Sequence, residues 1–357
     1  MTPDSHLKVK PIRWKDDHLA LLDQRCLPHE IRWLSCQDTP AVVEAIQQMV
    51  VRGAPAIGIA AAYGVVLAAR SAWHQQGTQW KDQIQTDLQA LAASRPTAVN
   101  LFWALERMQQ RLERLPDDQD PEPQLLEKAR QLHEADLEAN QIMGRLGAQV
   151  IAAQQDRGRE VMTHCNAGAL ATAGYGTALG VIRQAWSQGL ISQVHVNETR
   201  PWLQGARLTA WELAEEDIPV SLNVDAAAAH QLKTQPISWV IVGADRVTAQ
   251  GDVANKIGTY QLAIQALHHG ASLMVVAPTS TLDLDTEYGE DIEIENRSAE
   301  EVTHINGQRL AAQVAVANPV FDVTPADLID VLVTEKGVIH RPNKEKIARL
   351  MSLKAVH

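Results

Sequence analysis

The chain has 357 residues, 45% of them hydrophobic, and a formal net charge of −11 at pH 7. This length favours two domains, and the acidic balance argues against binding to nucleic acid or to a membrane surface, so we expect neither partner. The three cysteines provide no disulfide framework and no metal-ligand spacing, and the N-terminus shows no signal-peptide pattern. We therefore expect a cytoplasmic protein.

The first 150 residues predict short strands followed by helices. Strands are expected over 7–14, 18–22 and 30–34. Thr39 and Pro40 predict a helix N-cap followed by proline at the first helical position. Helices are expected from residue 39 and near 55–73, 80–93, 97–114 and 122–154. The longest apolar stretch, 54–69, is too short for a membrane span and is interpreted as a buried helix.

After residue 158, strand candidates alternate with helical segments. They lie at 160–163, 193–197, 220–223, 239–242 and 272–277. Each is an unbroken apolar run, which is typical of parallel strands covered on both faces. The pattern predicts an α/β fold: a C-terminal, doubly wound, Rossmann-like parallel sheet and a smaller N-terminal domain of short strands plus helices. We place the boundary near residue 150, with domains at 1–150 and 151–357.

The glycine-rich run from Thr163 to Gly180 is the most informative stretch of the chain. It follows the first of these strands and precedes a helical pattern at 181–186. A strand that enters a glycine-rich turn and then a helix is an anion-binding layout, because free backbone N–H groups and the helix dipole face the ligand. The same turn carries Cys165. A phosphate site and a reactive side chain in one loop indicate chemistry on a phosphorylated small molecule.

A second anion clamp is predicted in the N-terminal domain. The run from Arg52 to Gly58 places an arginine and small residues before a proline at a helix start. In the C-terminal domain, ligands are expected beyond the carboxyl ends of the parallel strands. The loops that follow these strands are 164–168, 198–207, 243–246 with 255–258, and 278–281, and we expect them to meet at one crevice.

Taken alone, two of the candidate residues in these loops also have ordinary structural explanations. Cys165 could be a small buried hydrophobic residue, which is the commonest fate of a free cysteine. Asp245 could be a helix N-cap or an ion-pair partner of Arg246.

Five motifs, in order along the chain, resemble the methylthioribose-1-phosphate isomerase family. They are Arg52–Gly58, Thr163–Gly168, Glu198–Arg207, Gly243–Arg246 and Asn255–Thr259. This family converts 5-methylthioribose 1-phosphate to 5-methylthioribulose 1-phosphate in methionine salvage. It is similar to ribose-1,5-bisphosphate isomerases and to regulatory subunits of the translation-initiation nucleotide-exchange factor, which are not enzymes.

The resemblance implies a set of site residues and an assembly. Asp245 resembles the proton donor, and Cys165 resembles the residue that stabilises the transition state. Substrate contacts are implied for Arg52, Gly53, Ala54, Arg95, Gln204, Asn255 and Lys256. It implies a homodimer that acts on a sugar phosphate with no metal or organic cofactor.

The expected chemistry follows from the substrate. Because its C1 oxygen carries the phosphate, the sugar ring cannot open by losing a hydroxyl proton. Asp245 could protonate the ring oxygen if partial desolvation keeps it protonated, and Cys165 could carry a proton between C2 and C1 or stabilise charge there. Transfer as a proton and transfer as a hydride both stay open.

Three alternatives are weighed against this interpretation. Gly174 and Gly176, with Glu198 further on, partly match a dinucleotide fingerprint, but Gly180 comes one residue later than that pattern requires. A non-enzymatic regulatory subunit would share the fold. A related isomerase would act on 5-deoxyribose 1-phosphate or ribose 1,5-bisphosphate.

Overall fold

The structure is a computed structural model that describes residues 9–96, 98–154, 158–305 and 307–352. Residues 7, 8 and 97, where two predicted elements begin, lie outside these ranges. The chain forms two compact units: Met1–Ile142 with Ala167–Gly180, and Met143–Asn166 with Val181–His357. The glycine-rich run therefore contributes to both units. A division into two domains at residue 150 stays a prediction.

The first unit contains a three-stranded antiparallel sheet, β1 (Ile12–Lys15), β2 (His18–Leu22) and β3 (Trp33–Cys36), in that order. The prediction for β2 is confirmed. β3 begins later than the predicted residue 30, because Glu30 still belongs to the turn and donates its N–H to the Cys26 carbonyl.

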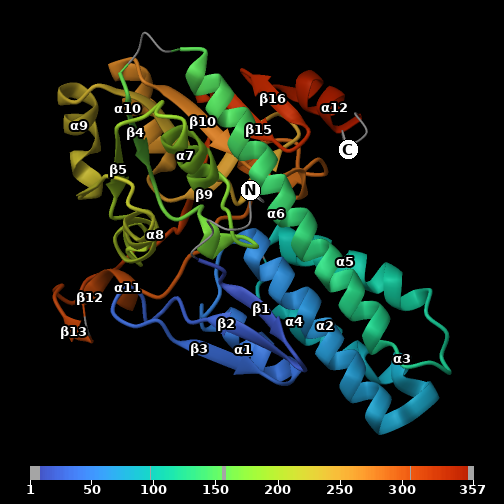
Figure 1. The fold of residues 1–357 in the computed structure, drawn as a ribbon. Coiled ribbons are helices and arrows are strands. Elements are labelled where there is room, and N and C mark those ends of the chain that lie inside the picture. The colour runs from blue at the N-terminus through green and yellow to red at the C-terminus, as the bar shows by residue number, and fades with distance from the viewer. Residues whose placement is uncertain (1–8, 97, 155–157, 306, 353–357) are drawn as a thin grey trace. The chain divides into compact units, whose positions relative to one another are not determined.

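Helices make up most of this unit (Figure 1). They are α1 (Thr39–Gln47), α2 (Ala54–Gln76), α3 (Trp80–Gln83), α4 (Gln85–Ala93), α5 (Val99–Glu113) and the first part of α6 (Glu122–Ala152). The predicted 80–93 helix is thus two helices, α3 and α4. The predicted cap was also wrong: the Asp38 carboxylate accepts from the Ala41 N–H at 2.9 Å and caps α1, whereas the Thr39 hydroxyl donates to the Gly64 carbonyl.

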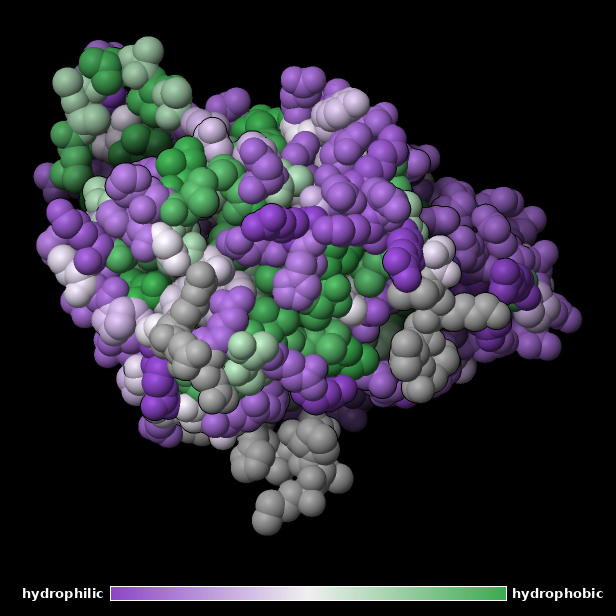
Figure 2. Space-filling model, turned by 90° about the horizontal axis from the view of Figure 1, so that it is seen from above, coloured by the Kyte–Doolittle hydropathy of each residue, from purple (hydrophilic) through white to green (hydrophobic). Residues whose placement is uncertain are grey.

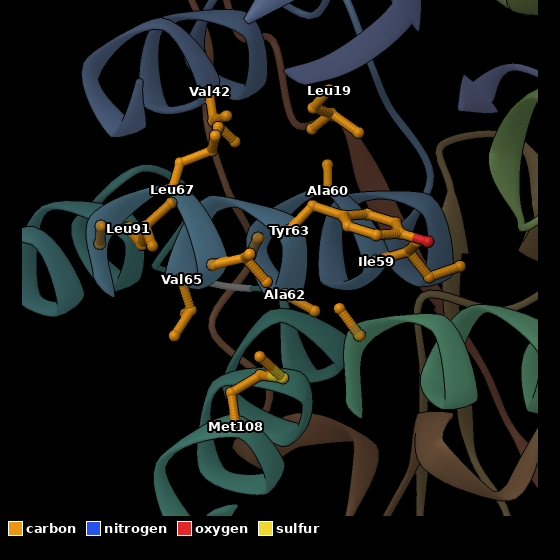
Figure 3. Packing of buried hydrophobic residues seen from close by; sticks show 14 of the residues in the cluster. Leu19, Val42, Ile59, Ala60, Ala62, Tyr63, Val65, Leu67, Leu91 and Met108 are labelled. Atoms are coloured by element: carbon orange, nitrogen blue, oxygen red, sulfur yellow. The ribbon is translucent and has the colours of Figure 1, made fainter. Parts of the chain in front are cut away.

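α2 forms the centre of the first unit's core. Its residues from Ala56 to Ala69 are all buried, and Figure 3 shows side chains of β2, α1, α4 and α5 around it. The stretch Ala54–Gln83 is long and apolar enough to cross a membrane, but 83% of its most apolar window is buried inside the structure. The prediction of a buried core helix is confirmed.

The second unit is built on a seven-stranded sheet in the order β16-β15-β10-β7-β4-β5-β6 (Figure 1). Its strands are β4 (Glu160–Thr163), β5 (Gln193–Asn197), β6 (Val220–Asn223), β7 (Ile237–Val242), β10 (Ser272–Val276), β15 (Val331–Thr334) and β16 (Gly337–His340). The six strands from β15 to β6 are mutually parallel, and only β16 is antiparallel to its neighbour. The predicted Rossmann-like sheet is confirmed.

Besides the short helix α11 described below, this unit contains most of α7 (Ala178–Ser187) and the whole of α8 (Ala210–Glu215), α9 (Ala228–Thr234), α10 (Thr259–His269) and α12 (Lys344–Ser352). A smaller four-stranded sheet contains β11 (Leu282–Asp283), β8 (Arg246–Thr248), β9 (Val253–Lys256) and β14 (Phe321–Thr324). Between β11 and β14 the chain forms α11 (Glu300–Thr303) and the hairpin of β12 (His304–Ile305) and β13 (Gln308–Arg309). The small sheet was not predicted, and it places Asn255 and Lys256 on a strand.

Candidate active site

The two predicted catalytic residues follow the two central strands of the large sheet. Counted along the chain, its parallel strands have the spatial order 3-2-1-4-5-6, which reverses between β4 and β7. Cys165 follows β4 and Asp245 follows β7, and the two strands pair with Met162 opposite Val240. Ligands of doubly wound sheets bind at this switch point, outside the carboxyl ends of the strands. The topology thus brings both residues to the edge where a ligand is expected.

Cys165 is held in an uncommon backbone conformation. Its φ is +62° and its side chain is buried, with 6% exposure. Its N–H donates to Thr199 Oγ1 at 2.8 Å, and its carbonyl accepts from Thr209 Oγ1 at 2.5 Å. Thr199 itself has φ +64°. Left-handed φ values cost of order 1–3 kcal/mol for residues other than glycine, and such strain clusters at functional sites.

The segment from Glu198 to Thr209, which we call the Gln204 loop, connects β5 to α8. It ends in a π-helical turn at Gly205–Thr209, a form often found at functional sites. Gln204 is 3% exposed, and its Oε1 has no hydrogen-bond partner in the described part of the chain. An unpaired buried acceptor costs about 1–3 kcal/mol, which a ligand donor would recover. This oxygen is therefore suited to accept from a bound hydroxyl.

His164 ties the Cys165 turn to the chain that follows β9. Its Nε2 donates to the Ile257 carbonyl at 2.8 Å, while its Nδ1 faces Asn197 Nδ2 at 3.4 Å. This pattern suits the neutral ring with its proton on Nε2. Burial lowers the pKa of His164, nearby Lys256 lowers it further, and Asp225 opposes both.

Asn255 and Lys256 are both buried at the end of β9, with 5% and 4% exposure. Asn255 Nδ2 donates to Thr259 Oγ1 at 3.1 Å. Lys256 Nζ donates to the Val320 carbonyl at 2.8 Å and lies 4.3 Å from the centroid of the Phe321 ring. Lys256 thus places a buried positive charge at the end of β9, which favours a nearby anion.

The N-terminus of α10 is already occupied by a carboxylate of this chain. Asp322 accepts from the N–H of Gly258 at 2.7 Å and from that of Tyr260 at 3.1 Å. Burial raises the pKa of Asp322 to about 6, against the lowering effect of these two N–H groups and of Lys256. A helix N-terminus favours negative charge, and here the protein supplies it.

The remaining predicted loops join the same network. Asp245 is half-buried, and its N–H donates to the Ala254 carbonyl at 2.9 Å, which connects the chain after β7 to β9. The 278–281 segment leads into β11, which pairs with β8, and Asp283 lies 3.2 Å from Arg246. Hydrogen bonds and strand pairing thus connect all four loops predicted to meet.

In the first unit, the predicted clamp residues precede two helices that pack together. Gly53 is the N-cap of α2 with φ +92°, and a Cβ there would lie 2.5 Å from Ala171 Cβ. Arg95 lies between α4 and α5, and Arg52 and Arg95 are both half-buried. A Cβ on Gly58 would lie 2.6 Å from the Asn100 carbonyl, so the first turns of α2 and α5 are in close contact. Neighbouring helix N-termini with adjacent arginines favour anion binding.

The glycine-rich run differs from the predicted strand–turn–helix. After Asn166 the chain joins the first unit, where it forms a 3₁₀ turn at Ala169–Ala171 and an antiparallel bridge between Gly168 and Gly176. α7 begins only at Ala178. A dinucleotide fingerprint needs its glycines in a tight turn directly after the strand, and Gly174 lies instead in this excursion.

Sequence reasoning missed the residues that hold the Cys165 turn. Thr199 lies inside the Glu198–Arg207 motif and Thr209 lies two residues beyond it. The motif does not indicate which backbone groups the two hydroxyls bind. Behind them, Asn166 Nδ2 donates to Glu212 Oε1 at 2.8 Å, and Glu212 pairs with Arg183 at 2.9 Å. The exposure of Glu212 is 0% and that of Arg183 is 7%.

Comparison with known proteins gives full-length matches. A model of the Initiation factor 2 subunit family matches residues 50–341. Two relatives named methylthioribose-1-phosphate isomerase, from Azotobacter vinelandii and Pseudomonas aeruginosa, are 60% and 59% identical to this chain, and each match covers 98% of both chains.

Two solved structures match closely. The crystal structure of 5-methylthioribose 1-phosphate isomerase from Pyrococcus horikoshii OT3 is 39% identical with a TM-score of 0.91 over 99% of both chains. That of translation initiation factor eIF-2B, subunit delta, from A. fulgidus is also 39% identical, with a TM-score of 0.83 over 96% of this chain and 100% of that one. The fold therefore occurs under both names, and function must be argued from the site.

Proposed function

Because the chain belongs to the Initiation factor 2 subunit family, we propose that it is an aldose–ketose isomerase that converts 5-methylthioribose 1-phosphate to 5-methylthioribulose 1-phosphate in methionine salvage. The observation that carries the proposal is the 60% identity, over 98% of both chains, to a relative named as this isomerase. The placement of Cys165 and Asp245 after the two switch-point strands supports it.

The reaction requires an acid and a group that assists hydrogen transfer. Asp245, half-buried after β7, protonates the ring oxygen so that the ring opens. A hydrogen then moves from C2 to C1, assisted by Cys165 at the end of β4. General acid–base groups typically contribute about 10²–10⁴-fold each to such reactions.

Substrate contacts are proposed for the residues that the family resemblance implies. Gln204 Oε1 accepts from a sugar hydroxyl, and buried Asn255 and Lys256 supply donors. In the first unit, phosphate contacts are assigned to Arg52, Gly53, Ala54 and Arg95. Two helix N-termini and two guanidinium groups suit a phosphate.

A homodimer and a cytoplasmic location complete the proposal. Along α10, Tyr260, Ile264 and Leu267 are 40%, 46% and 67% exposed and share one helical face. Such exposed apolar faces mark interaction surfaces, and Figure 2 shows apolar patches among the polar residues of the face in view. The three cysteines are free, which suits a reducing compartment.

The proposal is tested by an isomerase assay on purified protein, followed by NMR, with 5-methylthioribose 1-phosphate, 5-deoxyribose 1-phosphate and ribose 1,5-bisphosphate at equal concentrations. The highest kcat/KM is expected for the methylthio sugar. A preference for either other sugar would move the chain to a related pentose phosphate.

The regulatory-subunit alternative is favoured by one observation, the eIF-2B subunit delta match at the same 39% identity as the solved isomerase. It predicts no turnover with any of the three sugars. That result would replace the enzyme proposal.

A further inference from the structure

Two buried hydroxyl groups bracket the peptide units on either side of Cys165. Thr199 and Thr209 have exposures of 0%. The Thr199 hydroxyl accepts from the Cys165 N–H at 2.8 Å, and the Thr209 hydroxyl donates to the Cys165 carbonyl at 2.5 Å. Both come from the Gln204 loop, one near its start and one at its end.

Each hydroxyl has a donor and an acceptor partner, so its orientation is fixed. The Thr199 hydroxyl accepts from Cys165 and donates to the Asn197 carbonyl at 2.9 Å. The Thr209 hydroxyl donates to Cys165 and accepts from Asn166 Nδ2 at 3.2 Å. A fully satisfied buried network of this kind rigidifies its members.

Charged side chains hold both hydroxyls in place. The Asp225 carboxylate accepts from the N–H groups of Thr199 and Arg200, each at 2.8 Å. On the other side, Asn166 is anchored to Glu212, which is paired with Arg183.

Gln204 lies midway between the two threonines in sequence, so the loop that carries it is attached at both ends to the Cys165 backbone. A shift of the Cys165 backbone therefore requires a shift of the Gln204 loop. This arrangement couples a reacting group to a substrate contact.

We propose that Thr199 and Thr209 are positioning residues, which hold Cys165 in its left-handed conformation and fix its thiol relative to Gln204 and the substrate. This inference rests on the proposed function for its catalytic consequence. Without the two hydroxyls, Cys165 would relax toward negative φ, because the left-handed region is unfavourable for a side chain with a Cβ. The thiol would then leave the position that the reaction needs.

The test replaces each threonine by valine, which keeps the branched shape and removes the hydroxyl. For Thr199→Val and Thr209→Val, kcat is expected to fall roughly 10- to 100-fold, the effect of misplacing a reacting group by about 1 Å. KM should stay within about threefold, because the thiol acts in the transition state. Thr209→Ser restores the hydroxyl and should recover most of kcat.

Thr334→Val is the matched control. Thr334 is 0% exposed, and its hydroxyl also has two partners: it donates to the Gly337 carbonyl at 3.2 Å and accepts from the Lys336 N–H at 3.1 Å. It lies on β15, away from Cys165 in the strand order. The urea unfolding midpoint of Thr334→Val should fall by about as much as those of the Thr199 and Thr209 variants, while its kcat should stay at the wild-type value. An equal loss of kcat in Thr334→Val would overturn the inference.

A readout that needs no turnover separates this inference from the proposed function. In a Cys26→Ser background, iodoacetamide labelling of Cys165 is followed by mass spectrometry. Release of the 6% exposed thiol should accelerate labelling at least about fivefold in both valine variants. No turnover by the wild type would end the proposed function and leave this test standing. An unchanged kcat together with an unchanged labelling rate in both valine variants would overturn the positioning role. If Thr199→Val does not fold, Thr199→Ala takes its place in the test.

Discussion

Gly205→Ala should disrupt the site through a backbone contact that no side chain can relieve. A Cβ at Gly205 would lie 1.7 Å from the carbonyl oxygen of Asn197, at the end of β5, and real Cβ atoms essentially never approach closer than 3.0 Å. The loop and the strand end must therefore separate by at least about 1.3 Å. Gln204 immediately precedes Gly205 in the chain. Because misplacement of a substrate contact by about 1 Å can cost roughly 10²-fold in rate, kcat/KM should fall by roughly 100-fold or more. Overpacking should also cost about 1–3 kcal/mol of stability.

The assay compares kcat/KM and urea unfolding of Gly205→Ala with those of wild type and Gly270→Ala. Gly270 caps α10 with φ +76°, and a Cβ there would meet nothing within 4 Å. That control should lose only about 1–2 kcal/mol of stability, the cost of a left-handed alanine, and keep its activity. A Gly205→Ala protein with wild-type kcat/KM would refute the argument that this close approach sets the position of the Gln204 loop.

Two further predictions concern groups behind the site. The pKa of His164 is lowered in the folded chain, so as the pH falls the unfolded chain takes up a proton on this ring before the folded chain does. The neutral His164 therefore contributes its full stability above about pH 6.5, and this contribution is lost as the pH falls below that value. His164→Gln keeps a donor for the Ile257 carbonyl and should weaken the pH dependence of the urea unfolding midpoint between pH 8 and pH 5. An unchanged pH dependence would exclude His164 as its source. Arg183→Met leaves Glu212 without its cation and should destabilise the fold by about 3–5 kcal/mol in urea unfolding, and a loss below 1 kcal/mol would contradict that.

Five of the seven strands of the large sheet were predicted from the sequence, whereas β15 and β16 were not. β4, β5 and β6 begin and end at the predicted residues, although β6 is only partly buried and Leu222 on it is 51% exposed. Their spatial order was not readable, because pairing joins segments far apart in the chain. The α1 cap shows the limit of local rules. Asp38 and Thr39 are both good capping residues, but the Thr39 hydroxyl donates to the distant Gly64 carbonyl and Asp38 caps the helix.

The candidate site was predictable as a set of loops but not as a geometry. Parallel strands end at one edge, so the residues after β4 and β7 had to lie near each other. The role of Thr199 depended on a left-handed φ, and the burial of Lys256 depended on pairing between β9 and β14. Neither feature leaves a local pattern. The prediction for the glycine-rich run was wrong because Gly168 and Gly176 form an antiparallel bridge within the first unit, and a contact of this kind leaves no local pattern.

The most direct test of the account measures binding and turnover of 5-methylthioribose 1-phosphate by Cys165→Ser and Asp245→Asn. Calorimetric titration should give Kd values near that of the wild type, while kcat falls by about 10²–10⁴-fold in each variant. Wild-type turnover in either variant would remove that residue from the chemistry and contradict the assignment of the active site to the switch point.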